Sequence, residues 1–215
     1  MSKIDVVTYN GSWRIKSHIE TIRNLSFKEG NDSLAYEKYD PDNLDGQTWL
    51  VYVDDEVAAI SVAEASHYTG DPDIALRICR LHIAKKFRPA WLGMLAGEHQ
   101  LKWAKEQGYK VVYMTHDIHN RAINAMYQHK RYGAPITDIQ KEMHYLWYTD
   151  WYQSLKTDFN RLFRVDENSD FLQYVYYWTL EDGYVWSPKT NMINIKHGGN
   201  IAKHMSNQEI LNACK

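Results

Sequence analysis

The hydrophobic residues along the chain recur with two periods, one typical of strands and one typical of helices. Alternating or β-branched runs predict five strands, at residues 4–10, 48–53, 57–63, 74–84 and 111–115. The second and third runs flank a short acidic turn at residues 54–56, so we predict an antiparallel hairpin there. Alternation in the fourth run places four side chains on one face of its strand: Leu76, Ile78, Arg80 and His82.

Three other segments keep the spacing of an amphipathic helix. The first covers residues 17–27. The second covers residues 89–107, with Pro89 near its first turn and Gly108 directly after its end, where helices often place a glycine. The third covers residues 120–133, begins with an asparagine that can cap it and ends at a glycine.

The order of these elements predicts the fold class. A strand-helix-strand unit over residues 74–115 requires a parallel crossover, whereas the earlier hairpin is antiparallel. We therefore predict an α/β (α+β) fold with a mixed, mostly antiparallel sheet flanked by helices. A polar, turn-rich loop at residues 28–47 separates the first helix from the hairpin, and loops of this kind often contribute substrate contacts.

The C-terminal third of the chain is rich in aromatic residues and has a weaker periodicity. Residues 141–149 predict a strand. Residues 171–188 predict a hairpin around Asp182 and Gly183, and a buried helix at residues 171–178 is the alternative.

The end of the chain is expected to form an extension of the main domain. A capping box that begins at Ser206 predicts a short terminal helix. We expect residues 1–149 to form one domain and residues 150–215 to form an aromatic-rich C-terminal extension. Aromatic side chains are frequent in cores and interfaces, so this extension would pack on the domain or form a subunit interface, as in a homodimer.

Composition and charge exclude several classes of function. Only Cys79 and Cys214 are present among 215 residues, so no disulfide framework is predicted and a reducing cytoplasm is the expected location. The formal net charge of -2 gives no general attraction to nucleic acid or to an anionic membrane, so we expect neither as a partner. We find no secretion signal at the start of the chain and no apolar run long enough to span a bilayer.

A basic turn connects the fourth strand to the second helix. It contains Lys85, Lys86 and Arg88, and Gly93 lies in the first turns of the helix. Free backbone N–H groups and the helix dipole make such a junction an anion site, for which a phosphate or pyrophosphate is the natural ligand. A solvated basic loop is the alternative interpretation.

This segment resembles the acyl-CoA-binding core of the GNAT superfamily of N-acetyltransferases. The family motif is Arg or Gln, two residues, Gly, one residue, then Gly or Ala, and the sequence from Arg88 to Gly93 is RPAWLG. Arg88 and Gly93 match the motif. Trp91 stands where the first glycine is expected, and Pro89 removes one backbone donor.

The third predicted helix carries a second part of the resemblance. It is similar to the last core helix of the family, which begins with an asparagine, has a tyrosine seven residues later and ends at a glycine. Asn120, Tyr127 and Gly133 fit this pattern, whereas Ala134 stands where the family usually has phenylalanine. The resemblance covers about the first three-fifths of the chain.

The resemblance implies a binding cleft for acetyl-CoA (coenzyme A) between two strands that splay apart. The backbone from Leu81 to Ala84 would bind the pantetheine arm, and the turn from Lys86 through Arg88 to Gly93 would hold the pyrophosphate. Asn120 and Tyr127 would lie near the thioester. The cofactor-binding residues are thus expected to be Leu81, Ile83, Lys86, Arg88, Gly93, Asn120 and Tyr127.

Acyl transfer from a thioester to an amine needs an acid, a base and an oxyanion donor. A phenol with a pKa near ~10 can protonate the leaving thiolate, so Tyr127 is the expected acid. Glu64 and His82, on neighbouring strands, are the candidate general bases. Each has a structural alternative: Tyr127 also fits a core position, Asn120 fits a helix cap, and Glu64 and His82 fit a polar lining.

These observations predict an acyl-CoA-dependent N-acyltransferase that acetylates a primary amine of a small molecule or protein. No metal is expected, because the cluster of His116, Asp117 and His119 lacks the spaced ligands of a zinc site. The rival hypothesis is a GNAT-shaped interaction module with a degraded cofactor site, and a third is an enzyme for other acyl donors. Acidic residues of the 28–47 loop, such as Asp45, would suit a cationic amine.

Overall fold

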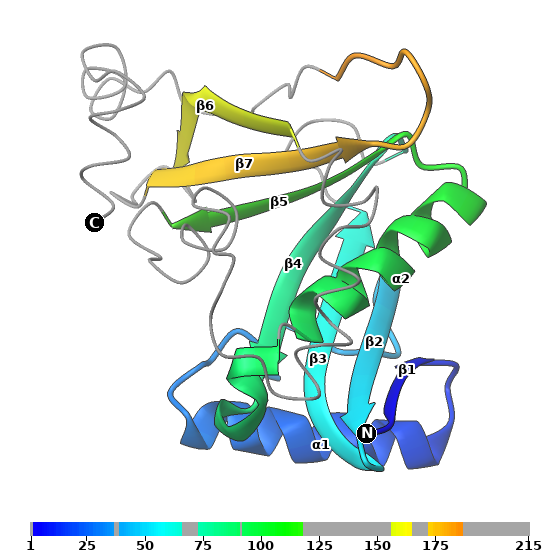
Figure 1. Cartoon of the computed structure of the whole chain (residues 1–215), viewed down its shortest axis with the longest axis vertical. Coiled ribbons are helices and arrows are strands. Elements are labelled where there is room, and N and C mark those ends of the chain that lie inside the picture. Colours follow the sequence, from blue (N-terminus) through cyan, green and yellow to red (C-terminus); the bar gives the residue numbers. More distant parts are fainter. Residues whose placement is uncertain are drawn as a thin grey trace.

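The computed structural model describes residues 2–36, 39–65, 73–90, 92–117, 156–164 and 172–186. These residues form one seven-stranded sheet and its covering helices (Figure 1). The elements in chain order are β1 (Ile4–Thr8), α1 (Trp13–Lys28), β2 (Gly46–Val53), β3 (Glu56–Ala65), β4 (Ala75–Ile83), the short 3₁₀ helix η2 (Lys85–Ala90), α2 (Leu92–Glu106), β5 (Val111–Asp117), β6 (Lys156–Arg164) and β7 (Leu172–Thr179).

The sheet has the order β1-β2-β3-β4-β5-β7-β6. Only β4 and β5 pair in parallel, and the other neighbours pair antiparallel. This confirms the predicted mixed, mostly antiparallel sheet. The β2–β3 hairpin is confirmed as well, and its turn residues Asp54 and Asp55 have φ angles of 50° and 66°. Two consecutive residues with positive φ are typical of the type I′ turn, which matches the twist of a hairpin.

The two long helices cover opposite faces of the sheet (Figure 1). Trp49 and Val51 of β2 belong to a core cluster that includes residues of α2, whereas the intervening Leu50 packs with Ile19 and Ile22 of α1. Because side chains alternate across a strand, neighbouring residues of β2 serve the two cores in turn. Both faces of the central strands are therefore buried.

A bulge in β4 changes which residues face α1. The pairing of β3 with β4 shifts between Val62 and Ala63, and Cys79 is the extra residue on β4. The predicted common face of Leu76, Ile78, Arg80 and His82 is therefore wrong beyond the bulge. Leu76 and Ile78 pack in the α2 core, whereas Arg80 lies over the Tyr39 ring and His82 contacts Asn31 on the α1 side. A bulge inserts one residue and so reverses the alternation after it.

The second helix begins later than the sequence predicts. Pro89 lies in η2, and α2 begins at Leu92 rather than at residue 89. The predicted end is confirmed, because Gly108 follows the helix with a φ of 88°, a conformation that glycine adopts without strain. The chain thus makes a 3₁₀ turn after β4 before it enters α2.

The strands β6 and β7 complete the sheet beyond β5. β7 pairs with β5 from Val111↔Thr179 onward and with β6 on its other edge. The alternative of a helix at 171–178 is therefore wrong, and the first strand of the predicted hairpin is confirmed as β7. A turn occurs at Asp182 and Gly183 as predicted, but residues 184–186 after it do not form the second strand of the hairpin.

Several expected elements lie outside the described residues. They are the helix at residues 120–133, the strand at 141–149 and the terminal helix from Ser206. Both β6 and β7 fall within the range 150–215 that we expect as an extension. β7 pairs with β5 and β6 pairs with β7, so these two strands lie at one edge of the same sheet.

Candidate functional site

The parallel strands β4 and β5 separate partway along their length. Their ladder has four pairs, from Ala75↔Val111 to Ile78↔Met114, although β4 continues to Ile83 and β5 continues to Asp117. The two strands diverge beyond this point (Figure 1). The last parallel pair includes Ile78, the residue directly before the bulge at Cys79, so the two strands separate where β4 is bulged.

The separated part of β4 presents its backbone toward β5. The Ala84 N–H group donates to the Ala58 carbonyl at 2.9 Å, so Ala84 faces β3. Backbone groups alternate along a strand, and the N–H and C=O groups of Leu81 and Ile83 therefore point to the opposite side. No described strand pairs with β4 on that side beyond Ile78. The Ile83 carbonyl on this side accepts from Arg88 Nε at 3.1 Å. The Ile83 N–H group and both backbone groups of Leu81 can hydrogen-bond to an extended ligand as another strand would.

Gly93 brings the start of α2 close to this edge. A Cβ atom at Gly93 would lie 2.9 Å from Leu81 Cδ2 and 3.5 Å from Ile83 Cδ1. Three residues of the predicted cofactor site, Leu81, Ile83 and Gly93, are thus brought together. The first N–H groups of α2 lack intrahelical partners, and its first turn contains no acidic residue, so this helix end favours an anion.

Two of the three basic side chains near this helix end are paired with carboxylates. Lys86 forms an ion pair with Glu56 in the β2–β3 turn. Arg88 donates from its NH2 group to Glu29 Oε2 at 3.1 Å and from Nε to the Ile83 carbonyl at 3.1 Å. Lys85 is exposed, and its ammonium group has no ion pair among the described residues. The sequence did not single out Lys85 from its two neighbours.

Both candidate bases lie on the α1 side of the sheet. Glu64 accepts a hydrogen bond from Arg80 at 3.2 Å, and its side chain is 25% exposed. His82 is only 2% exposed, and burial lowers the pKa of its imidazole. Its Nδ1 accepts from the Asn31 side-chain amide, which leaves the proton on Nε2, 3.4 Å from Glu29 Oε2. His82 is therefore neutral and shielded from water, whereas Glu64 keeps contact with solvent.

Cys79 at the bulge is poorly suited to act as a nucleophile. Burial raises the pKa of its thiol to about 12, and the thiol donates to the Val62 carbonyl at 3.4 Å. Because the thiolate is the reactive form, a covalent intermediate on Cys79 is disfavoured at neutral pH. Tyr127 and Asn120, the remaining predicted site residues, lie outside the described residues.

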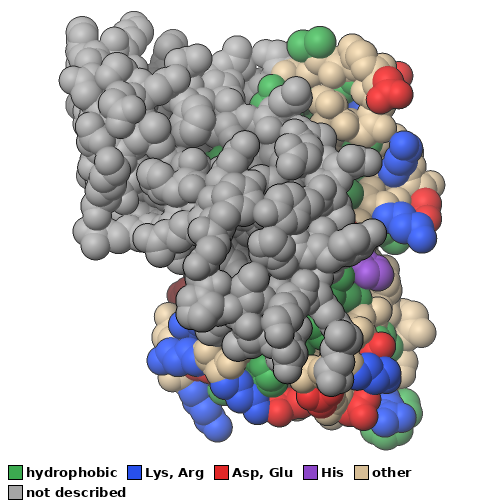
Figure 2. All heavy atoms as spheres, in the orientation of Figure 1, with side chains coloured by type: hydrophobic (Ala, Val, Ile, Leu, Met, Phe, Trp, Pro, Cys, Tyr) green, Lys and Arg blue, Asp and Glu red, His purple; other side chains and the backbone are tan. Residues whose placement is uncertain are grey.

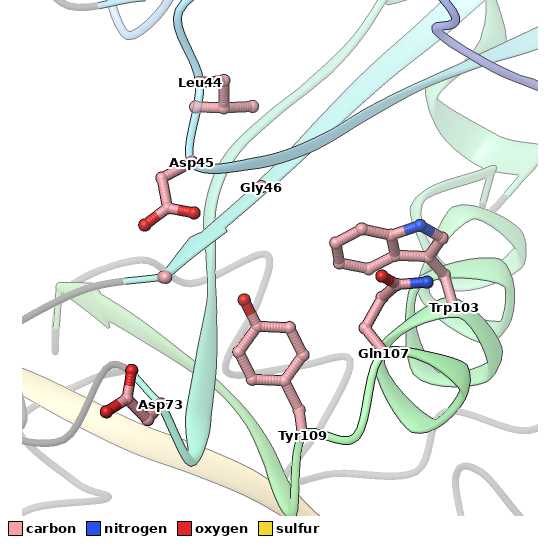
Figure 3. A pocket seen from close by; sticks show the side chains of 8 residues that line it. Leu44, Asp45, Gly46, Asp73, Trp103, Gln107 and Tyr109 are labelled. Atoms are coloured by element: carbon pink, nitrogen blue, oxygen red, sulfur yellow. The ribbon is translucent and has the colours of Figure 1, made fainter.

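A separate cavity of about 780 Å³ lies at the other end of α2 (Figure 3). Its described lining consists of Leu44, Asp45, Gly46, Ala65, Asp73, Trp103, Gln107 and Tyr109. The Tyr109 hydroxyl points into the cavity, and burial together with the carboxylates of Asp45 and Asp73 raises the pKa of Tyr109. A cavity with this charge is unsuited to phosphate. It is therefore not a candidate for the predicted pyrophosphate site.

The acidic loop at residues 28–47 contributes unevenly to this cavity. Asp45 lines it, whereas Asp42 is bound by the Tyr9 hydroxyl and the Lys16 ammonium group. Asp40 accepts from the Asn43 side chain and from the Asp42 N–H group. Asp40 and Asp42 therefore shape the loop, whereas Asp45 faces this cavity.

The described surface gives further information on partners. On the face shown in Figure 2, the described acidic and basic side chains are interspersed, so neither sign forms a continuous patch there. Within the described residues, no three or more His, Cys, Asp or Glu side chains form a group that could hold a metal ion. None of the described helices is both long enough and apolar enough to cross a membrane.

Comparisons with known proteins identify the fold. Searches of protein-family models and of curated proteins found no match. The ribosomal-protein-S18-alanine N-acetyltransferase from Escherichia coli superposes with a TM-score of 0.52 at 7% identity, over 86% of this chain and 100% of that chain. The aminoglycoside 6'-N-acetyltransferase from Enterococcus faecium gives a TM-score of 0.53 at 11% identity, over 84% and 99%. An aminoglycoside 6'-N-acetyltransferase complexed with coenzyme A gives 0.52 at 13% identity, over 84% and 99%.

The chain has the fold of the GNAT superfamily of N-acetyltransferases. At these identities the likeness concerns the fold, and one fold can serve several functions. The chemistry of this chain therefore depends on its own residues.

Proposed function

We propose that the protein is an acyl-CoA-dependent N-acyltransferase that acetylates a primary amine by direct transfer in a ternary complex. The observation that carries this proposal is the separated edge of β4. Leu81 and Ile83 present backbone groups toward β5, and Gly93 places the start of α2 beside them. An extended ligand with a phosphate at one end fits an open strand edge that leads to a helix N-terminus.

Acetyl-CoA would be held by residues of β4, η2 and α2. The backbone of Leu81 and Ile83 would bind its pantetheine arm, and the N–H groups around Gly93 would bind its pyrophosphate. The Lys85 ammonium group adds a positive charge that no described carboxylate neutralises. When bound, acetyl-CoA supplies an activated acyl group as a thioester.

The protein groups around the reacting atoms would act as acid, base and oxyanion donor. Glu64 would take a proton from the attacking amine, directly or through water, because it is the more accessible of the two candidate bases. A backbone N–H group of residues 81–83 would stabilise the oxyanion, and Tyr127 would protonate the departing thiolate. Asn120 would help to place the thioester.

The burial of His82 argues against it as the direct base. Proton exchange with a substrate needs access to that substrate, and the His82 ring is enclosed by Asn31 and Glu29. His82 is better suited to hold the end of β4 against α1. The raised thiol pKa of Cys79 favours direct transfer over an acyl-cysteine intermediate.

The acceptor would be an amine of a small molecule or of a protein. The names of two structural neighbours refer to an alanine of a ribosomal protein and to aminoglycosides, so amines of both kinds occur as substrates on this fold. We further propose that the enzyme acts in the cytoplasm, with no metal and no nucleic-acid partner. Residues 150–215 would contribute to a homodimer interface.

The rival function is a GNAT-shaped interaction module that binds no cofactor. Trp91 and Pro89 are departures from the family motif that favour it. Pro89 lies in η2, before the first turn of α2, so the N–H group it lacks belongs to the 3₁₀ turn rather than to the helix. The proline therefore leaves the helix N-terminus intact as an anion site.

Calorimetric titration with acetyl-CoA separates the two functions. The enzyme should bind acetyl-CoA, and Gly93→Trp should abolish binding because its side chain would occupy the space next to Leu81. Release of free thiol from acetyl-CoA in the presence of a panel of primary amines then tests transfer. A folded wild-type protein that binds no acetyl-CoA would exclude the enzyme and leave the interaction module.

A further inference from the structure

Glu29 connects the end of α1 to the turn that precedes α2. The Lys85 N–H group donates to both of its carboxylate oxygens, at 3.0 and 3.1 Å, and the Arg88 NH2 group donates to Oε2 at 3.1 Å. The Glu29 side chain is 11% exposed. A carboxylate from a distant part of the chain thus fixes both the backbone and a side chain of η2, where the two elements meet (Figure 1).

Arg88 extends this connection to the end of β4. Its Nε donates to the Ile83 carbonyl at 3.1 Å while its NH2 group donates to Glu29. One planar guanidinium therefore bridges the last residue of β4 and the residue after α1. A phosphate is bound best by two parallel N–H groups of an arginine. The Nε and Nη2 side of the Arg88 guanidinium, which could offer such a pair, is directed to protein acceptors instead.

We propose that Glu29 is a positioning residue for the acyl-CoA-binding turn and that Arg88 acts through Glu29 rather than by contact with the pyrophosphate. This inference rests on the proposed function. It assigns the phosphate contacts to the N–H groups at the start of α2 and to the Lys85 ammonium group. Arg88 has two tasks in this arrangement: it neutralises the Glu29 carboxylate next to an anion site, and it fixes the turn.

The removal of either Glu29 or Arg88 should weaken the binding of acetyl-CoA, because each residue depends on the other to keep the turn in place. Without Arg88, the Glu29 carboxylate is left uncompensated near the place of the pyrophosphate and repels it. Without the Glu29 charge, the Lys85 N–H group and the Arg88 guanidinium lose the acceptor that orders the turn. The two effects depend on the same contact and should not add.

The test is calorimetric titration with acetyl-CoA of the wild type, Glu29→Gln, Arg88→Gln, Arg88→Lys and the double variant E29Q/R88Q. Glu56→Gln is the matched control, because Glu56 also pairs with a basic side chain of η2 but is 55% exposed. Thermal unfolding of every variant confirms that it is folded at the titration temperature. Arg88→Lys keeps the charge but cannot bridge Ile83 and Glu29.

We expect Glu29→Gln, Arg88→Gln and Arg88→Lys each to weaken binding by about tenfold, because each disrupts charged hydrogen bonds that order the turn. The double variant should bind no more weakly than the weaker single variant, and Glu56→Gln should bind as the wild type does. Normal binding by Arg88→Lys, additive losses in the double variant or tighter binding by Glu29→Gln would each overturn the proposal.

Hydrogen exchange separates a failure of this inference from a failure of the proposed function. If the wild type binds no acetyl-CoA, the proposed function is lost, and the role of Glu29 is then judged from the Lys85 amide alone. Faster exchange of this amide in Glu29→Gln than in Glu56→Gln supports the fixed turn. Equal exchange in the two variants would overturn it.

Discussion

Gly46 allows a direct test of how closely the backbones of β2 and β3 approach each other at the start of β2. It is the first residue of β2 and pairs with Glu64 of β3. A Cβ atom at Gly46 would lie 2.1 Å from the Ala63 carbonyl oxygen and 2.6 Å from the Glu64 Cα. Both are backbone atoms of a strand that is paired on each edge, so they cannot rotate away as a side chain would.

Gly46→Ala should therefore destabilise the protein strongly. Overpacking typically costs about 1–3 kcal/mol, and we expect about 3 kcal/mol because backbone must move. In a domain of this size that loss lowers the melting temperature by about 6–12 °C. Urea unfolding and calorimetry measure both quantities.

Gly93→Ala is the matched control for Gly46→Ala. Its nearest atoms are the flexible ends of the Leu81 and Ile83 side chains, so the change in unfolding free energy should stay within about 1 kcal/mol. Wild-type stability of Gly46→Ala, or equal losses in the two variants, would refute the close approach of β2 to β3 at this residue.

Three further changes test other parts of the structure. Burial lowers the pKa of His82 below its ordinary 6.5, so the unfolded chain binds a proton more readily than the folded protein does. The stability that neutral His82 contributes is therefore complete above about pH 6.5. It is lost as the pH falls toward the pKa of the folded state. Urea unfolding across this range should show a smaller pH dependence for His82→Gln, and an unchanged one would contradict the burial. Arg23→Met should lower the free energy of unfolding by about 3 kcal/mol, because Arg23 is 1% exposed and donates to the Tyr39 carbonyl at 2.8 Å. Thermal unfolding measures this loss, and a value below about 1 kcal/mol would show that the buried Arg23 hydrogen bond does not stabilise the fold. Tyr127→Phe should lower turnover by about 10²–10⁴ in a steady-state assay, and unchanged turnover would remove Tyr127 as the acid.

The local parts of the fold could be predicted from the sequence. The β2–β3 hairpin follows from alternating hydrophobic residues around Asp54 and Asp55, and the end of α2 follows from Gly108. These signals depend on residues close together in the chain, and turn and cap chemistry acts over the same range. The order of elements then limited the sheet to a mixed one.

The bulge at Cys79 could not be predicted, because nothing in the alternation of β4 marks an inserted residue. Its position depends on pairing with Val62 and Ala63, sixteen or more residues earlier in the chain. This matters for the site, since regular alternation places His82 on the same face as Leu76 and Ile78, whereas the bulge turns it to the opposite face. Register is set by the partner strand, and a shift of one residue exchanges the two faces.

The ion pairs of the basic turn could not be predicted either, because their partners lie far away in the sequence. The sequence shows three adjacent cations, and their spacing suggests a common anionic ligand. In the structure Glu56 pairs with Lys86, and Glu29, which is 59 residues before Arg88, pairs with it. Such long-range ion pairs decide which cation is left for a ligand. Of the three cations in the turn, Lys85 is the one whose ammonium group has no ion pair with a described residue.

The exchange of backbone amides in β4 tests the central claim, that the separated edge of β4 binds acyl-CoA. Hydrogen exchange would be followed at Leu81 and Ile83 with and without saturating acetyl-CoA, and Ala84, whose N–H already bonds to Ala58, is the internal reference. We predict that acetyl-CoA slows exchange at Leu81 and Ile83 and changes Ala84 much less. Binding of acetyl-CoA without any protection of Leu81 and Ile83 would contradict the account.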